Sequence, residues 1–227
     1  MEKLTSPFDI IKKSWGIFTK RENLIYLIKI YSPIGFLAVI SLAFTYVPLL
    51  TKFFETYSGN IVMSIFNFLF AILAIFINLS GIIAVTAIIG GQTPTIESIY
   101  KKALSKYLKF LLLTIVVYII FALGIVLLIV PFILFMTWFA FSMFIYVERG
   151  TGIRASLSES KKLVKGRFWK IFVRISAFGL FSVLSQIVLS FLPLGMGTIA
   201  YYLIGGLFLL PQILLYKEVT SETSVNG

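Results

Sequence analysis

The sequence predicts an all-α polytopic membrane protein with six transmembrane helices. Of its 227 residues, 59% are apolar and 13% are charged, and the mean hydropathy is +1.01. A soluble domain has about 45–50% apolar and about 25% charged residues, so polar side chains are too few here to cover a water-soluble core. The chain also contains four long uncharged runs, each near or above the roughly 20 residues that a helix needs to cross a bilayer.

The first two uncharged runs each predict one transmembrane helix. Ile30–Thr51 has the length of a single span. Thr56–Ile96 begins with the polar segment 56–60 and closes with the turn-forming segment 90–94, which leaves one long or tilted helix between them.

The last two uncharged runs each predict a pair of helices. Phe110–Val147 contains Pro131, and Pro is best tolerated in a first helical turn, so we expect a tight hairpin that turns near 128–130. Ile175–Tyr216 is divided by the turn-forming segment 193–197. The total is therefore six helices.

Lys and Arg are distributed very unequally between the two ends of these helices. With six crossings, both termini and the connections 91–109 and 148–174 share one face, and that face holds every Lys and Arg except Lys52. Positively charged segments stay in the cytoplasm during insertion, so we expect both termini to be cytoplasmic. The net charge of +11 is then explained by the orientation of the chain in the membrane. It does not indicate nucleic-acid binding, because the chain lacks the polar surface of a soluble basic protein. We expect one domain over residues 1–219 and a disordered polar tail over residues 220–227.

Three basic segments on the predicted cytoplasmic face resemble one another. Residues 6–15, 93–104 and 151–163 each precede a pair of spans, contain a Lys-Lys pair and open with a Ser or Thr suited to cap a helix. Their apolar and basic residues separate at helical spacing, which is typical of an amphipathic helix in the membrane interface. Any juxtamembrane segment becomes basic and amphipathic under the same physics, so a threefold internal repeat and independent origins both stay open. The predicted repeat units are about 6–90, 93–147 and 151–216.

The cations and tryptophans of these segments are the predicted lipid-headgroup residues. Juxtamembrane cations attract anionic lipids by about 1 kcal/mol per charge, and Trp side chains anchor at the headgroup level. Orientation alone would also place cations here, and this second interpretation stays open. The predicted headgroup residues are Lys12, Lys13, Trp15, Lys101, Lys102, Lys161, Lys162, Lys165, Arg167 and Trp169.

A structural elbow is predicted at the end of the fourth span. Glu148 stands directly before Arg149 and Gly150, where the chain must stop, turn and restart along the interface. We expect a salt bridge between Glu148 and its sequence neighbours Arg149 and Arg154 to fasten this elbow, and headgroup or substrate recognition is the alternative. No second group completes a catalytic constellation around Glu148, so we predict no catalytic residue.

A few uncharged polar side chains fall inside the spans. An amide in hydrocarbon costs several kcal/mol unless it finds a partner, so we expect these amides to face other helices, with a polar path as the alternative. Gly205 and Gly206, and the pair Ser176 and Gly179, are predicted close-packing positions. No ionisable residue lies in mid-span, which disfavours an ion-coupled pump. The four amides are Asn67, Asn78, Gln186 and Gln212.

The chain contains neither Cys nor His. Their absence excludes disulfides, thiol chemistry, His-ligated metals and imidazole catalysis. We therefore predict no metal site and no cofactor.

Residues 148–169 carry a family resemblance. The elements concerned are Glu148, Gly150, Ala155, Ser160, Leu163, Gly166 and Phe168–Trp169, with Pro131 upstream and Leu215–Tyr216 near the end. This region resembles that of a widespread prokaryotic six-helix membrane family, which includes the membrane domain attached to some glycerophosphodiester phosphodiesterases. The resemblance implies a helical architecture in the prokaryotic plasma (inner) membrane. It implies no hydrolase activity, because that catalysis belongs to a separate soluble domain rich in His and acidic ligands.

These observations leave three functions open. The first is a non-catalytic inner-membrane protein that engages anionic lipids through its basic helices, in envelope or lipid organisation or as the membrane partner of another protein. The second is a permease or carrier for a lipid-like or small apolar solute, with a cavity lined by Asn67, Asn78 and Gln186. The third is an intramembrane enzyme that uses Glu148. The expected partners are membrane lipids and not nucleic acid, while the sequence specifies neither a protein partner nor an oligomeric state.

Overall fold

The computed structural model describes residues 4–47, 51–52, 55–127 and 129–225, and all its regular structure is helical. Six segments of these residues are long and apolar enough to cross a membrane, which confirms the predicted number and indicates a multi-pass membrane protein by length and composition. The helices are α1 (Pro7–Phe18), α2 (Arg21–Tyr46), α4 (Tyr57–Ile89), α5 (Ile96–Val126), α6 (Ile129–Trp138), α7 (Ser142–Arg149), α8 (Ile153–Val164), α9 (Phe168–Ser190), the 3-10 turn η1 (Pro193–Gly195), α10 (Met196–Leu203) and α11 (Gly205–Val225). The candidate spans are Arg21–Phe44, Ser58–Ile89, Ile96–Val126, Ile129–Arg149, Phe168–Ser190 and Pro193–Ser221.

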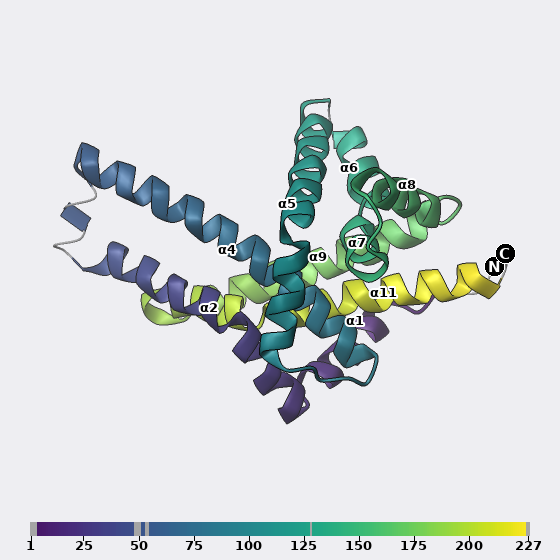
Figure 1. The fold of residues 1–227 in the computed structure, drawn as a ribbon, viewed down its shortest axis with the longest axis horizontal. Coiled ribbons are helices and arrows are strands. Elements are labelled where there is room, and N and C mark those ends of the chain that lie inside the picture. The colour runs from purple at the N-terminus through teal and green to yellow at the C-terminus, as the bar shows by residue number, and fades with distance from the viewer. Residues whose placement is uncertain (1–3, 48–50, 53–54, 128, 226–227) are drawn as a thin grey trace.

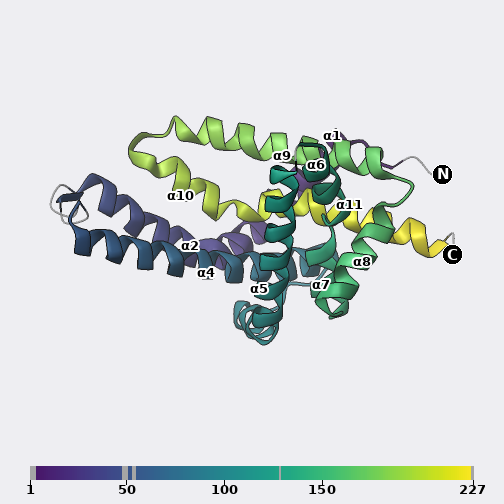
Figure 2. The ribbon, with the colours of Figure 1, turned by 90° about the horizontal axis from the view of Figure 1, so that it is seen from above.

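Three helical hairpins extend from a common base (Figure 1). They consist of α2 with α4, α5 with α6, and α9 with α10. The first and third hairpins extend to the same side of the molecule, whereas the α5–α6 hairpin leaves the base in another direction (Figures 1 and 2). Helices α1, α7, α8 and α11 form the base together with the adjoining parts of the longer helices, and α1 packs along α11. We call this end of the molecule the base throughout.

The second hairpin turns where its proline predicts. Helix α5 ends at Val126 and α6 begins at Ile129, so Pro131 occupies the first turn of α6. The two helices approach closely at Gly124, where an added Cβ would lie 2.8 Å from the Cα of Phe132. The expected turn near 128–130 is thereby placed correctly to within a residue or two.

The third hairpin turns at the predicted Pro- and Gly-containing segment. η1 connects α9 to α10, with Leu194 at φ 54° and Gly195 at φ 70°. This left-handed backbone is strained for Leu194 and is well suited to Gly195. Gly197 lies against the end of α9, where an added Cβ would lie 1.9 Å from the carbonyl oxygen of Leu189. The turn is therefore closed by backbone contact.

The sixth span is broken into two helices, which the sequence did not predict. Helix α10 ends before Ile204 and α11 begins at Gly205. An added Cβ at Gly205 would lie 2.7 Å from the Tyr31 ring, and one at Gly206 would lie 3.0 Å from Leu27. These contacts with α2 support the expectation of close packing at both glycines. Gly179 lies in open space, with nothing within 4 Å, so close packing is not found there.

The expected set of three separate interfacial helices is not formed. The first and third segments become α1 and α8, but the middle one is the beginning of α5, which continues into the membrane without interruption. The reason is local, since the sequence from Ile96 to Val126 contains no Pro and its single Gly is Gly124, close to the end. The predicted separate middle helix is therefore wrong.

The helix caps agree with the prediction in one segment of three. Ser6 caps α1 by accepting a hydrogen bond from the Asp9 amide at 3.2 Å. Thr95, and not Thr93, caps α5, and α8 begins after Gly152 with no side-chain cap. The three segments therefore begin in different ways.

The C-terminal segment differs from the expectation of a disordered tail. Helix α11 continues to Val225, and so contains most of residues 220–227. Val219 is fully buried, and the Thr220 hydroxyl donates to the Tyr216 carbonyl at 2.9 Å. The backbone amide of Thr5 also donates to the carboxylate of Glu218. The Glu218 bond ties α11 to the N-terminal segment, and the Thr220 bond belongs to the helix as it continues past the expected boundary.

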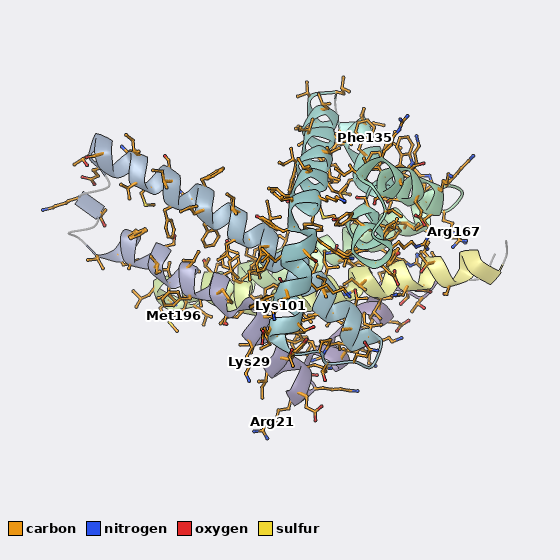
Figure 3. All side chains as sticks on the ribbon, in the orientation of Figure 1. Arg21, Lys29, Lys101, Phe135, Arg167 and Met196 are labelled. Carbon is orange, nitrogen blue, oxygen red and sulfur yellow. The ribbon has the colours of Figure 1, made fainter. Side chains whose placement is uncertain are left out.

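The tightly packed core lies in the base. The exposed surfaces of the hairpins are formed mainly by apolar side chains. Fully buried side chains include Leu27 in α2, Leu79 in α4 and Leu210 in α11. Large apolar side chains remain exposed along the hairpins, as is normal for surfaces that face lipid. In Figure 3 the labelled Arg21 and Arg167 lie at the base, whereas Phe135 and Met196 lie out on the hairpins.

A pair of glycine substitutions tests the closed turn between α9 and α10. We expect Gly197→Ala to lower the free energy of unfolding by about 1–3 kcal/mol, because the new methyl group would overlap the Leu189 carbonyl. Gly179→Ala in the open middle of α9 is the matched control, and it should leave stability unchanged or raise it by up to about 1 kcal/mol. Thermal unfolding of both purified variants in detergent measures the difference. Equal behaviour of the two variants would contradict the close contact.

Candidate functional site

Cations gather at the base, while the hairpins carry almost no charge. In Figure 3, Arg21, Lys29, Lys101 and Arg167 all lie at this end. The predicted headgroup cations Lys12, Lys13, Lys101, Lys102, Lys161, Lys162 and Lys165 are exposed, and Arg167 is half-buried. The base thus presents a basic surface formed by α1, the start of α5, α8 and the turn that follows α8.

Helix α1 has an inward apolar face and an outward aromatic pair. Ile10 and Phe18 are buried against the base, whereas Phe8 and Trp15 are 74% and 54% exposed. The apolar residues of α1 are thus divided between the packed core and the exposed surface. Two exposed aromatic side chains beside exposed lysines suit a position at a membrane interface, where Trp rings favour the headgroup level. Trp169 at the start of α9 is exposed in the same way, at 70%.

Helix α8 supports the broken fourth span. This span ends at Trp138 as α6 and resumes as α7, and a break inside a helix leaves backbone groups without their usual partners. The Ser160 hydroxyl donates to the Trp138 carbonyl at 2.7 Å and accepts from the Phe141 amide at 3.1 Å. Lys161 lies over the Trp138 ring, with 4.3 Å between its Nζ and the ring centroid. The sequence analysis missed this role of Ser160. Its spacing of four residues from Ser156, which places both serines on one face of α8, is the pattern that could have indicated it.

The elbow after α7 is fastened by two ion pairs. Gly150 adopts φ 66°, a left-handed conformation that ends α7 and reverses the chain. Glu148 pairs with Lys217 of α11, and Arg149 pairs with Glu159 of α8. The two pairs tie three helices together at the base.

The pairing differs from the one expected from sequence neighbours. Arg154, expected beside Glu148, is exposed and forms no ion pair within the described part of the chain. The actual partner, Lys217, lies 69 residues away, because α11 reaches back along the base to α7 and α8. Both pairs are partly exposed, so each contributes at most about 1 kcal/mol to stability.

A cavity of about 350 Å³ opens at the base between α4, α5 and α7. Lys102 and Lys106 line it from one face of α5, since residues four apart are neighbours on a helix. The Nζ of Lys106 donates to the Val147 carbonyl at 2.7 Å, which fixes that cation at the wall. Lys102 is exposed and bonds to no other side chain in the described ranges. The predicted elbow residue Glu148, which pairs with Lys217, also lines this cavity. Other polar lining residues are Thr86, Gln92 and Ser98.

Four tyrosine hydroxyls hold this part of α5 in place. Each donates to a backbone carbonyl on a neighbouring segment, and such bonds between elements fix helix positions. The α5 lysines are consequently held in a defined register beside α4 and α7. The bonds run from Tyr26 to Pro94 at 2.7 Å, Tyr100 to Ile30 at 2.9 Å, Tyr107 to Ile72 at 2.7 Å and Tyr146 to Lys106 at 3.1 Å.

The intramembrane amides do not meet at a common axis. Asn67, Asn78 and Gln186 are exposed and form no hydrogen bond to any described residue, which differs from the expectation that they face other helices. Gln212 donates to the Phe208 carbonyl of its own helix at 3.0 Å. Asn78 lines a second cavity, of about 260 Å³, whose walls include neither Asn67 nor Gln186. The residues proposed for a carrier cavity are therefore not brought together.

Comparison of the chain with protein-family models, with curated proteins and with solved structures finds no match. The resemblance of residues 148–169 to a six-helix membrane family stays a prediction from the sequence. In the structure these residues form the last turn of α7, the elbow, α8 and the start of α9. They belong to the base, where they connect the fourth and fifth spans.

A serine pair on α8 tests the support of the broken span. Ser160→Ala removes the hydroxyl that bonds both the Trp138 carbonyl and the Phe141 amide. We expect it to lower the free energy of unfolding by about 1–3 kcal/mol, because these two backbone groups lose their hydrogen bonds. Ser158→Ala, an exposed position on the same helix, should change stability by less than about 0.5 kcal/mol. Denaturation of the detergent-purified variants provides the comparison. A stable Ser160→Ala protein would show that the break needs no support from α8.

Proposed function

We propose that this protein is a non-catalytic integral membrane protein that acts in envelope or lipid organisation. It engages anionic lipids through the positively charged surface at its base. The observation that carries this proposal is the gathering of exposed cations and exposed tryptophans at one end of the molecule, next to hairpins that are almost free of charge. A lipid headgroup layer has the matching order, with anionic phosphates above hydrocarbon.

The proposed energy of this interaction comes from many weak contributions. A Lys or Arg near an anionic leaflet contributes about 1 kcal/mol, and the attraction falls off within a Debye length. Trp15 and Trp169 add interfacial anchoring, because an exposed indole ring favours the headgroup level. Several exposed lysines acting together would therefore enrich anionic lipids around the base.

The proposed setting is the prokaryotic plasma membrane, with the base and both termini in the cytoplasm. The positive-inside rule supports this orientation, because Lys52 stands alone among the cations at the far end of a hairpin. The resemblance of residues 148–169 supports the choice of membrane.

The two other functions find less support in the arrangement of side chains. Glu148 is held in an ion pair with Lys217, which favours a structural role for this carboxylate over a catalytic one. The amides suggested for a carrier are distributed over separate positions on α4 and α9. A role as the membrane subunit of another protein is compatible with the basic surface and is distinguished by co-purification.

The absence of cysteine from the sequence allows a clean test of orientation. In intact cells we expect Lys52→Cys to react with a membrane-impermeant maleimide, since this position lies at the outer end of a hairpin. Ser158→Cys on the exposed face of α8 should react only after permeabilisation. The reverse pattern of labelling would show that the base faces outward.

Lipid enrichment tests the proposed interaction directly. We expect a variant with Lys12, Lys13, Lys162 and Lys165 all changed to Gln to lose enrichment of phosphatidylglycerol over phosphatidylcholine, because the summed attraction of four exposed charges is removed. The matched control changes the same four residues to Arg and keeps the charge. Quantifying the lipids that co-purify from mixed bilayers gives the comparison. Equal enrichment in both variants would reduce these cations to orientation signals.

A further inference from the structure

We infer that two copies of this protein associate in the membrane through one face of α4. In this pair, Asn67 of each copy forms a hydrogen bond with Asn67 of the other. The two copies have the same orientation and are related by a twofold axis along the membrane normal. The association goes beyond the proposed function and does not depend on lipid binding at the base.

A row of small and amide side chains runs along α4. Its members follow one another at alternating steps of four and three residues. At about 100° per residue, these steps keep all of them within about 80° of the helix circumference. Every position in this row is Asn, Ser or Ala, and we call it the α4 row. It consists of Asn60, Ser64, Asn67, Ala71, Ala74 and Asn78.

The large exposed side chains of α4 lie on a different part of its surface. They are all apolar and are 44–66% exposed. At about 100° per residue they fall on an arc centred about 140° away from the α4 row. Contact with lipid explains the apolar arc but not a row of amides and small residues. The apolar arc consists of Ile61, Val62, Ile65, Phe68 and Leu69.

Helix α5 covers only the inner part of the α4 row. Ala74 and Asn78 line the cavity of about 260 Å³, whose walls include Phe110 and Thr114 of α5. Farther from the base, the α5–α6 hairpin diverges from α4 (Figure 1). The four row positions within Asn60–Ala71 are all exposed. This outer part of the row is therefore accessible to a helix of another molecule.

Asn67 requires a polar partner that its own chain does not supply. It is exposed and forms no hydrogen bond to any described residue. It lies about 10 Å from the middle of the candidate span Ser58–Ile89, within the half-thickness of about 15 Å of the hydrocarbon core. Long Lys and Arg side chains reach the interface from such depths, but Asn is too short to do so. An unpartnered amide in hydrocarbon is costly, so a partner from outside the chain is favoured.

A second copy supplies the matching group. An amide contains both donors and an acceptor, so two identical amides can satisfy each other. In a parallel pair of helices, residues at alternating steps of three and four meet their own counterparts, as the a and d positions of a coiled coil do. Asn67 therefore meets Asn67 of the second copy, and a polar residue at such a position fixes the register. Ser64 and Ala71 on either side are small enough to let the two helices approach closely.

Closure of the α5–α6 hairpin onto α4 would satisfy Asn67 less well. The outer part of α5, from Ile115 to Val126, contains no amide. Its one hydroxyl belongs to Tyr118, which lines the inner cavity together with Asn78. The Thr114 hydroxyl already donates to the Phe110 carbonyl at 2.8 Å. The second copy is therefore the better occupant of the outer row.

Two exposed amides provide the test of the Asn67 pair. Asn67→Leu removes the proposed bond, and Gln186→Leu on α9 is the matched control because it removes another exposed amide without a described partner. Dyes on Ser158→Cys, the single cysteine of the labelled chain, report energy transfer between copies in bilayers of increasing lipid-to-protein ratio. We expect Asn67→Leu to raise the dissociation constant of the dimer by about fivefold. Gln186→Leu should stay within about twofold of the parent chain.

Single cysteines along α4 provide the test of the contact face. Ser64→Cys and Ala71→Cys lie on the row and should form disulfide-linked dimers when membranes are treated with copper phenanthroline as oxidant. Ile65→Cys and Leu69→Cys lie at similar depths on the apolar arc and should stay monomeric. The absence of native cysteine makes each linkage unambiguous.

Several outcomes would overturn the inferred dimer. A protein that is monomeric at every lipid ratio excludes the association and leaves the row to lipid, to α5 or to another protein. Equal effects of Asn67→Leu and Gln186→Leu exclude the amide pair, and equal crosslinking from both arcs excludes the α4 row as the contact. None of these results changes the expected enrichment of anionic lipids at the base, so the proposed function is tested separately.

Discussion

Backbone polar groups have no water to bond inside a bilayer, and this constraint governs how the chain is allowed to deviate from straight helices. Two of these deviations come with a side chain that supplies a missing bond. Ser160 bonds both sides of the break between α6 and α7. Within α2, Pro33 cannot donate to the Lys29 carbonyl, and the Ser32 hydroxyl donates to it instead at 2.8 Å. These two serines therefore keep backbone carbonyls bonded where the helices depart from regular geometry.

The number of spans follows from sequence because it depends on local properties. Uncharged length determines where a helix can cross, and Pro131 and the Pro193 segment determine where the chain must turn. The C-terminal helix and the Glu148–Lys217 pair depend on contacts between distant segments, so sequence neighbours gave the wrong partner for Glu148. The break before Gly205 is of the same kind, since it accompanies packing against Tyr31 on α2.

The candidate site shows the same division. The basic character of α1, α5 and α8 could be predicted, and Lys102 was among the predicted residues. Lys106 was not, although its spacing of four from Lys102 was visible, because its importance depends on Val147 and the wall formed by α7. The amides were predicted to face other helices, but which side of a helix faces a neighbour is set by how the hairpins diverge. Asn78 therefore reaches a cavity, while the chemically identical Asn67 does not.

The uninterrupted course of α5 gives the middle segment different mechanics from the other two. Gly166, at φ 81°, lies in the joint between α8 and α9, and Thr19 and Lys20 separate α1 from α2. Such joints absorb rotation, so a displacement of α1 or α8 need not reach the following span. Helix α5 has no joint, and it acts as a stiff rod that carries Lys102 at one end and the turn with α6 at the other. Spin-label distances across the two ends of α5 should consequently stay constant when bilayer thickness is varied, while those across the α8–α9 joint change.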